Sequence, residues 1–181
     1  MNWRNTDNSY GLVSIGLHWL IAATAVGLFA LGVWMVELGY YDPWYRRAPQ
    51  VHKSVGILLF GIMLARLAWR RANPRPRPIG SALQNRVAAG VHSLLNVLLF
   101  ALTLSGYLIS TADGRAIEVF ALFSMPATLS GLENQADIAG RVHKLLGFAL
   151  IGVAALHAGA ALKHHFVDHD RTLRRMLSSK P

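Results

Sequence analysis

The sequence predicts an all-α membrane protein, a four-helix transmembrane bundle with both termini in the cytoplasm. Hydrophobic residues make up 53% of the 181-residue chain and charged residues only 15%, and the mean hydropathy is +0.34. These values are unlike those of an ordinary soluble domain. The apolar residues are also collected into long runs, and a hydrocarbon layer of ~30 Å needs ~20 residues to cross it. The runs are Gly11–Val36, Val55–Trp69 (about 19 residues with Val51–Ser54 included), Val87–Ile109 and Val142–Leu162.

Basic residues are distributed unevenly among the segments that connect these runs. With the N-terminus inside, 12 of the 18 basic residues fall on the cytoplasmic side, which the positive-inside rule favours. The net charge of +9 is then explained by topology and by attraction to the headgroups of the lipid bilayer. We therefore expect no nucleic-acid partner. The 12 residues are Arg4, Arg66, Arg70, Arg71, Arg75, Arg77, Arg86, Lys163, Arg171, Arg174, Arg175 and Lys180.

The chain begins with a polar segment, Met1–Tyr10. This segment has one basic residue and no clear cleavage site after it, so we expect the first helix to remain in the mature protein. That helix is predicted over Gly11–Val36. An outer loop, Glu37–Gln50, follows, and Pro43 and Pro49 argue against a continuous helix there.

The second helix begins near Val51 and ends among arginines. It is followed by Asn73–Pro78, where alternating proline and arginine predict an extended, polyproline-like connection. After the third helix, the loop Ser110–Ala139 is largely apolar at its centre, and we expect it to lie along the outer membrane surface or to cap the bundle. The fourth helix is predicted to begin at Arg141. The basic tail beyond it is expected to be helical around Arg171–Leu177.

Five histidines lie within these helices or at their ends, and the topology gives each one a depth. His143 and His157 are 14 residues apart, so on a helix they lie within about 40° of each other and roughly 21 Å apart along the axis. His52 opens the other inward-running helix and shares the outer level with His143. His18 and His92 lie about 10 Å inside the cytoplasmic face, near the level of His157. Depth therefore pairs His52 with His143, but it leaves either His18 or His92 as the partner of His157.

Two layers of imidazoles predict two stacked b-type haems, each with bis-histidine ligation. Polar side chains are costly in lipid and mark functional sites there, and imidazole in a helix bundle is a usual haem ligand. The chain has no cysteine, which excludes thiolate zinc sites, cysteine-ligated iron–sulfur clusters and covalent c-type haem. A zinc transporter is disfavoured, because structural zinc needs four converging ligands and intramembrane carboxylates are missing.

Small residues are frequent in the first and fourth helices. They would let a flat macrocycle lie against the backbone, but they equally favour close packing between helices, and the sequence leaves both readings open. These residues are Gly16, Ala22, Ala23, Gly27, Gly32, Gly147, Gly152, Ala154, Ala155, Ala158 and Gly159.

Several motifs in order along the chain give it a family resemblance. The sequence resembles the bacterial cytochrome b561 family from about Tyr10 to Leu177. Each fragment is weak alone, but the ordered set is specific. The motifs are Gly16-Leu17-His18-Trp19, Ala30-Leu31-Gly32-Val33-Trp34-Met35 followed by Tyr40-Tyr41, Ala48-Pro49 before His52-Lys53-Ser54-Val55-Gly56, Arg141-Val142-His143-Lys144, and Leu156-His157-Ala158-Gly159-Ala160-Ala161-Leu162-Lys163-His164-His165.

The resemblance implies a four-helix protein of the bacterial inner membrane with two b haems that exchanges electrons with ubiquinone. It further implies that His18 pairs with His157, and His52 with His143. The choice of His18 over His92 rests on the family alone. His92 is then a residue beside the haem or the quinone, or a plain interhelical hydrogen-bonding residue. We expect the di-haem domain to span residues 10–165 and a basic cytoplasmic tail to span residues 166–181.

Basic residues adjoin both outer histidines. Lys53 and Lys144 directly follow His52 and His143, and Arg141 is close by. They are expected to neutralise haem propionates or to steer an anionic substrate to the outer haem edge. One branch of the family resembles a superoxide oxidase, which passes electrons from superoxide to ubiquinone. The alternative is a haem-bearing anchor subunit that serves a dehydrogenase or a periplasmic redox partner.

Overall fold

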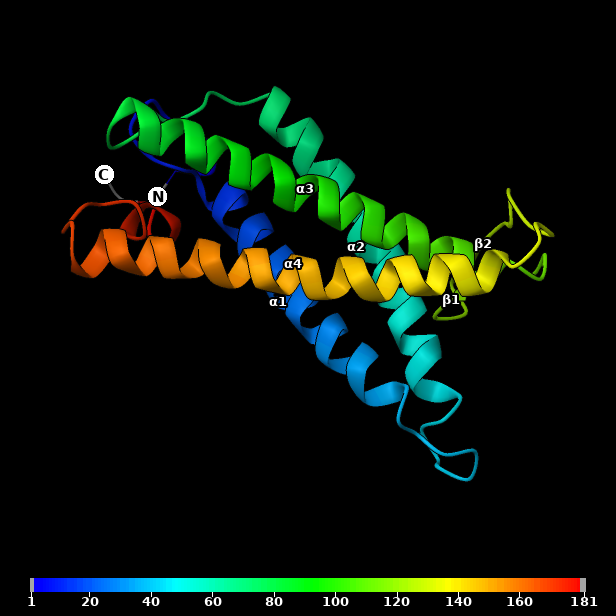
Figure 1. Ribbon diagram of the computed structural model, residues 1–181. Helices are drawn as coiled ribbons and strands as arrows, with labels where there is room; N and C mark the ends of the chain where they lie inside the picture. Colours follow the sequence, from blue (N-terminus) through cyan, green and yellow to red (C-terminus); the bar gives the residue numbers. More distant parts are fainter. Residues whose placement is uncertain (1, 180–181) are drawn as a thin grey trace. The chain divides into compact units, whose positions relative to one another are not determined.

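The computed structural model describes residues 2–179 and contains four long α-helices and one small β-sheet (Figure 1). All four helices are long and apolar enough to cross a bilayer. The prediction of an all-α protein with four transmembrane helices is therefore confirmed. Lys180, which we assigned to the basic tail, lies outside the described residues. The helices are α1 (Leu12–Met35), α2 (Arg47–Arg71), α3 (Ala82–Ser110) and α4 (Gln135–Phe166).

Most apolar side chains of these helices face away from the rest of the chain. Leu156 and Leu145 of α4, for example, are 76% and 71% exposed. A soluble monomer rarely exposes contiguous apolar surface on this scale. These side chains form the surface that lipid covers, while the helical backbone satisfies its own hydrogen bonds.

The chain groups into two compact units, and each unit contains one end of all four helices. The first unit contains residues 2–22, 62–96 and 152–179, and the second contains Ala23–Gly61 and Val97–Ile151. The three histidines His18, His92 and His157 belong to the first unit and are called the histidine trio below. His52 and His143 belong to the second unit and are called the histidine pair.

The polar segment before α1 satisfies the first backbone N–H groups of that helix. Asn5 accepts hydrogen bonds at Oδ1 from the Gly11 N–H at 2.9 Å and from Ser14 Oγ at 2.7 Å. The Leu12 N–H donates to the Asn2 carbonyl at 2.9 Å. A helix start leaves such N–H groups without an intrahelical partner, so residues 2–10 act as an extended cap.

Three helices begin earlier than the apolar runs predict. α2 begins at Arg47, so Pro49 lies in its first turn, and the expectation that the loop extends to Gln50 is wrong. Proline is tolerated in a first turn because the N–H it lacks would have no intrahelical partner there. α4 likewise begins at Gln135 and not at Arg141, and α3 begins at Ala82. The additional turns are polar, and hydropathy therefore did not reveal them.

A short β-hairpin lies in the connection between α3 and α4. Strand β1 (Ile117–Val119) pairs antiparallel with β2 (Phe123–Met125). Phe120 and Ala121 at the turn have positive φ values of 48° and 57°, the geometry of a type I′ turn, which normally favours Asn and Gly. The hairpin could not be recognised from the sequence, because the turn lacks those residues.

The hairpin is fastened to the first turns of α2, on both sides of His52. Gln50 Nε2 donates a hydrogen bond to the Glu118 carbonyl at 3.0 Å, and Ser54 Oγ donates to the same oxygen at 3.2 Å. The Phe120 N–H donates to Ser54 Oγ at 3.3 Å. Ser54 is fully buried by these contacts, so the loop holds the end of α2 that carries His52.

Candidate functional site

The histidine pair brings together α2 and α4 in the second unit. The ring centroids of His52 and His143 are 6.1 Å apart, with an angle of 69° between the ring planes. The two residues are far apart in sequence, so their proximity is a tertiary feature. The structure therefore brings together the two histidines that the predicted depths had matched.

Each ring of the pair packs against a glycine of the preceding helix, His52 against Gly32 and His143 against Gly106. A Cβ atom built on Gly32 of α1 would lie 3.2 Å from His52 Cε1, and one built on Gly106 of α3 would lie 3.1 Å from His143 Cε1. Both distances are shorter than an ordinary van der Waals contact, which is 3.4–4 Å. A larger residue at either position would therefore press on the ring and shift it by a few tenths of an ångström. In both cases the Nδ1–Cε1 edge of the ring faces the glycine.

His143 is also held by hydrogen bonds from α3. Its Nδ1 lies 3.0 Å from the Leu102 carbonyl and 3.1 Å from Ser105 Oγ. A carbonyl oxygen only accepts, so the hydrogen in that contact lies on Nδ1. Nε2 then carries the free lone pair, which is the arrangement that metal-ligating histidines show. His52 differs, because its Nδ1 is buried without a hydrogen-bond partner.

The histidine trio brings together α1, α3 and α4 in the first unit. The His18 and His157 ring centroids are 6.4 Å apart, with a plane angle of 72°. His92 is nearer to His157, with centroids 5.0 Å apart and a plane angle of 71°. All three predicted histidines therefore meet, with His157 between the other two.

The distances between ring centroids indicate which pairs of histidines would leave room for an iron between two imidazoles. Each metal–nitrogen bond is about 2 Å and each nitrogen lies about 1 Å from its ring centroid, so two such rings are about 6 Å apart. The ring centroids of His52 and His143 are 6.1 Å apart and those of His18 and His157 are 6.4 Å apart, a spacing that would leave room for an iron between the rings, whereas the His92 and His157 centroids are only 5.0 Å apart. Among residues 2–179, no three His, Asp or Glu side chains converge as ligands for a bare ion. Two-histidine sites suit an iron whose other ligands come from a porphyrin.

Arg66 adds a positive charge next to the trio. It is half-buried and close enough to interact electrostatically with His18 and His92. The second helix was expected to end among Arg66, Arg70 and Arg71, and α2 does end at Arg71, which places Arg66 inside the helix. An arginine inside a membrane span is a functional signal in itself, and we missed it. Gly106 and Ser105 were missed as well, because no sequence pattern shows which ring they contact.

The three basic residues that adjoin the pair in sequence lie within the first three turns of the helices that carry the histidines. Lys53 of α2 is half-buried, while Arg141 and Lys144 of α4 are exposed. A small cavity of about 260 Å³ lies nearby, lined by Ser105, Val142 and residues of the α3–α4 connection. Since Ser105 contacts His143, this cavity approaches the ring from the side of that connection.

Comparison with known proteins places the whole chain in one family. Residues 9–179 match the family model for prokaryotic cytochrome b561. Over 179 residues the chain is 49% identical to Cytochrome b561 homolog 2 of Escherichia coli (strain K12), covering 98% of this chain and 95% of the relative. It is 32% identical over 179 residues to the Probable superoxide oxidase CybB of Yersinia pestis, covering 94% of this chain and 97% of the relative. It is 29% identical over 178 residues to Cytochrome b561 homolog 1 of Escherichia coli (strain K12), with 94% and 97% covered.

These matches extend over nearly the full length of the chain and of its relatives, and they agree with the four apolar helices and the two groups of histidines. The resemblance drawn from the histidine motifs is therefore confirmed. The chain belongs to the prokaryotic cytochrome b561 family, whose members are haem-bearing electron-transfer proteins of the bacterial inner membrane.

Proposed function

We propose that this protein is a di-haem b oxidoreductase that carries electrons from the periplasmic side to ubiquinone, with superoxide as the donor. The observation that carries the proposal is the spacing of the histidines. The ring centroids of two separate imidazole pairs are 6.1 and 6.4 Å apart, a spacing at which each pair could hold one haem iron. Two b haems bound there would supply a one-electron relay.

The proposed ligands are His52 with His143 and His18 with His157. The hydrogen bond from His143 Nδ1 to the Leu102 carbonyl fixes the ring tautomer and leaves Nε2 available to the metal. The His92 ring is nearer to His157, with centroids 5.0 Å apart, which supports assigning His92 a place beside the inner haem and His18 the role of ligand. Arg66 provides a positive charge on that side, which suits a haem propionate.

Both termini are proposed to lie in the cytoplasm, with the di-haem domain over residues 10–165 and the tail over residues 166–181. The support is the excess of basic residues in the segments assigned to that side. In this orientation the histidine pair lies near the periplasm and the trio near the cytoplasm. A donor that cannot cross the membrane then meets the pair first.

Superoxide is proposed as the donor because the surroundings of the pair favour a small anion. Lys53, Arg141 and Lys144 supply three positive charges, and they either draw an anion toward the haem edge or neutralise the propionates. One relative, 32% identical, is named a probable superoxide oxidase. In the balanced reaction, two superoxide anions are oxidised to two molecules of dioxygen. One ubiquinone takes up the two electrons and two protons and becomes ubiquinol.

A stopped-flow measurement on the oxidised, haem-loaded protein tests this function. Mixing with superoxide is expected to produce a reduced b-type α band, and added ubiquinone is expected to reoxidise it. A b-type spectrum that superoxide leaves oxidised would overturn the proposed donor while keeping the electron-transfer role. Absence of a Soret band in a folded, haem-supplied preparation would overturn the ligand assignment.

The second candidate is a haem-bearing anchor that passes electrons for a dehydrogenase or a periplasmic partner. The relative at 49% identity is named a cytochrome b561 homologue, a name that specifies no electron donor and fits either candidate. The anchor function predicts a co-purifying redox subunit and no reduction by superoxide in the isolated protein. The same stopped-flow experiment, repeated on protein purified in a mild detergent that preserves bound subunits, separates the two candidates.

A further inference from the structure

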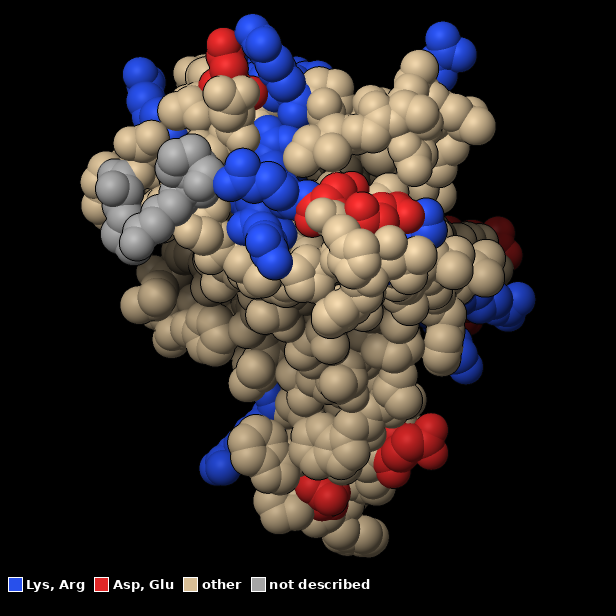
Figure 2. Space-filling model, turned by 90° about the vertical axis from the view of Figure 1, so that its left-hand side faces the viewer, with Lys and Arg blue, Asp and Glu red and all other residues tan. Residues whose placement is uncertain are grey.

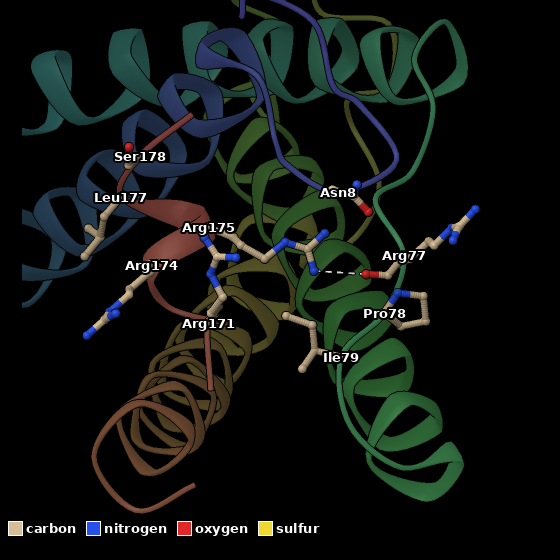
Figure 3. Close-up of a pocket in the computed structure, with 9 residues that line it drawn as sticks. All are labelled: Asn8, Arg77, Pro78, Ile79, Arg171, Arg174, Arg175, Leu177 and Ser178. Atoms are coloured by element: carbon tan, nitrogen blue, oxygen red, sulfur yellow. Dashed lines mark hydrogen bonds between the residues drawn. The ribbon is translucent and has the colours of Figure 1, made fainter. Parts of the chain in front are cut away.

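A cavity of about 580 Å³ lies in the first unit, apart from the histidine trio (Figure 3). Three segments line it, each just beyond the end of a membrane-spanning helix. They are the polar segment before α1, the linker between α2 and α3, and the tail after α4, which contains the short 3₁₀ helix η1 (Arg174–Met176). Because each of these helices is long enough to cross the hydrocarbon layer, segments beyond the helix ends lie outside that layer, where headgroup phosphates can reach the cavity.

Hydrogen bonds between these segments build the walls of the cavity. The Arg77 N–H donates to the Asp7 carbonyl at 2.7 Å, and Arg175 Nη1 donates to the Arg77 carbonyl at 2.9 Å. Trp19 Nε1 donates to the Met176 carbonyl at 2.7 Å, which ties the tail to α1. The cavity is therefore formed by contacts within the chain itself, before any ligand arrives.

The charge of the lining is entirely positive. Four of the nine lining residues are arginines, namely Arg77, Arg171, Arg174 and Arg175, and none is acidic. In Figure 3, the Arg175 side chain extends from the tail to the linker and the Arg171 side chain lies beside it, while those of Arg77 and Arg174 point outward. Figure 2 shows several Lys and Arg side chains on this face of the molecule.

The two acidic side chains of the tail, Asp168 and Asp170, have partners on α4. Asp168 accepts hydrogen bonds from Lys163 Nζ at 2.8 and 2.9 Å, and both Asp168 and Asp170 lie within ion-pair distance of His164. The arginines of the cavity therefore have no carboxylate partner among residues 2–179.

Arg175 has donors that the chain does not use. Its guanidinium lies 5.7 Å from the ring centroid of Tyr10 and donates to one carbonyl, yet its Nε is buried without a hydrogen-bond partner. Guanidinium groups present a planar fork that matches phosphate oxygens, and such charge-assisted bonds are the strong ones. Apolar Ile79 and Leu177 complete the lining and would suit the glycerol and acyl part of a lipid.

We propose that this cavity binds one phosphate group, from an anionic phospholipid headgroup or from a soluble phosphorylated molecule. The phosphate would bridge Arg171 and Arg175 of the tail and so fasten the tail to the linker. This site is independent of the proposed superoxide reaction, because it rests on none of the histidines or of the basic residues near the pair.

The test is a binding titration of the full-length, haem-loaded protein in detergent. The probes are dioctanoyl phosphatidylglycerol, dioctanoyl phosphatidylcholine and inorganic phosphate. The test variant is Arg171→Gln with Arg175→Gln. The control is Arg75→Gln with Arg86→Gln, which removes the same charge from exposed residues of the same unit outside the cavity lining. Haem content and the circular dichroism spectrum report whether each variant is folded.

For the wild type we expect one bound phosphatidylglycerol per chain, at least tenfold weaker binding in the test variant, and a change below twofold in the control. Arg171→Lys, which keeps the charge without the fork, is expected to fall between. Equal affinity for phosphatidylglycerol and inorganic phosphate would assign the site to a soluble phosphate, and tighter phosphatidylglycerol binding would assign it to the lipid. Equal loss in both double variants, or no saturable binding of either phosphate probe, would overturn the proposal.

Discussion

Replacing Gly106 by alanine tests the proposed haem ligation most directly. The added Cβ would lie 3.1 Å from His143 Cε1 and 3.4 Å from His143 Nδ1. The ring or the helix must therefore move by about 0.3 Å to reach the shortest ordinary contact of 3.4 Å. His143 cannot move freely, because its Nδ1 is hydrogen-bonded to Leu102 and its Nε2 would be bonded to iron.

The magnitude follows from two opposing effects. Alanine favours a helix over glycine by about 1 kcal/mol, whereas overpacking a fitted contact costs about 1–3 kcal/mol. Gly90 on the same helix has no atom within 4 Å of a built Cβ, so Gly90→Ala carries the first effect without the second. The difference in haem affinity between the two variants isolates the steric cost. That cost of about 1–3 kcal/mol corresponds to roughly 5- to 150-fold weaker binding of one haem.

The assay measures haem per protein by pyridine haemochromogen and follows haem transfer to excess apomyoglobin. Gly106→Ala is expected to release one of its two haems faster, with the other haem unchanged, and Gly90→Ala is expected to match the wild type. Electron paramagnetic resonance gives a second readout, because a turned His143 ring changes the angle of 69° between the His52 and His143 ring planes, to which the spectrum of a haem held by both rings would respond. Identical haem retention and identical spectra in the two variants would refute the argument that this glycine positions a ligand.

Three further predictions concern other parts of the molecule. His52→Ala should leave one haem per chain, whereas His92→Ala should keep two; a one-haem His92→Ala protein would show that the wrong partner was chosen for the inner haem. Replacing Lys53 and Lys144 by glutamine should slow reduction by superoxide more than reduction by a neutral donor, because steering acts on charge; equal slowing would favour a role in propionate binding. Hydrogen bonds from a lysine hold the pKa of Asp168 below its usual range. The stability that this depressed pKa contributes is therefore present above the unfolded-state pKa and lost as the pH falls through the folded-state pKa. Hydrogen exchange in the tail should thus differ between wild type and Asp168→Asn at neutral pH and converge in acid; a difference that persists in acid would contradict this.

The four helices could be predicted because the bilayer imposes length and hydropathy on each span separately. The helix starts were less predictable, since the first turns of α2 and α4 are polar and Pro49 lies where proline is harmless. The hairpin at Phe120 and Ala121 escaped prediction because its turn adopts positive φ without glycine or asparagine.

The sequence by itself determined which histidines share a depth, because helix rise and the positions of the apolar runs are local properties of the chain. Only the tertiary structure decided their spacing, which depends on how each helix is rotated about its own axis. That rotation sets 6.4 Å between His18 and His157 and 5.0 Å between His92 and His157, and it brings Gly106 against His143. The arginine cavity likewise joins segments that are far apart in sequence. Such contacts depend on folding of the whole chain, so no local pattern reveals them.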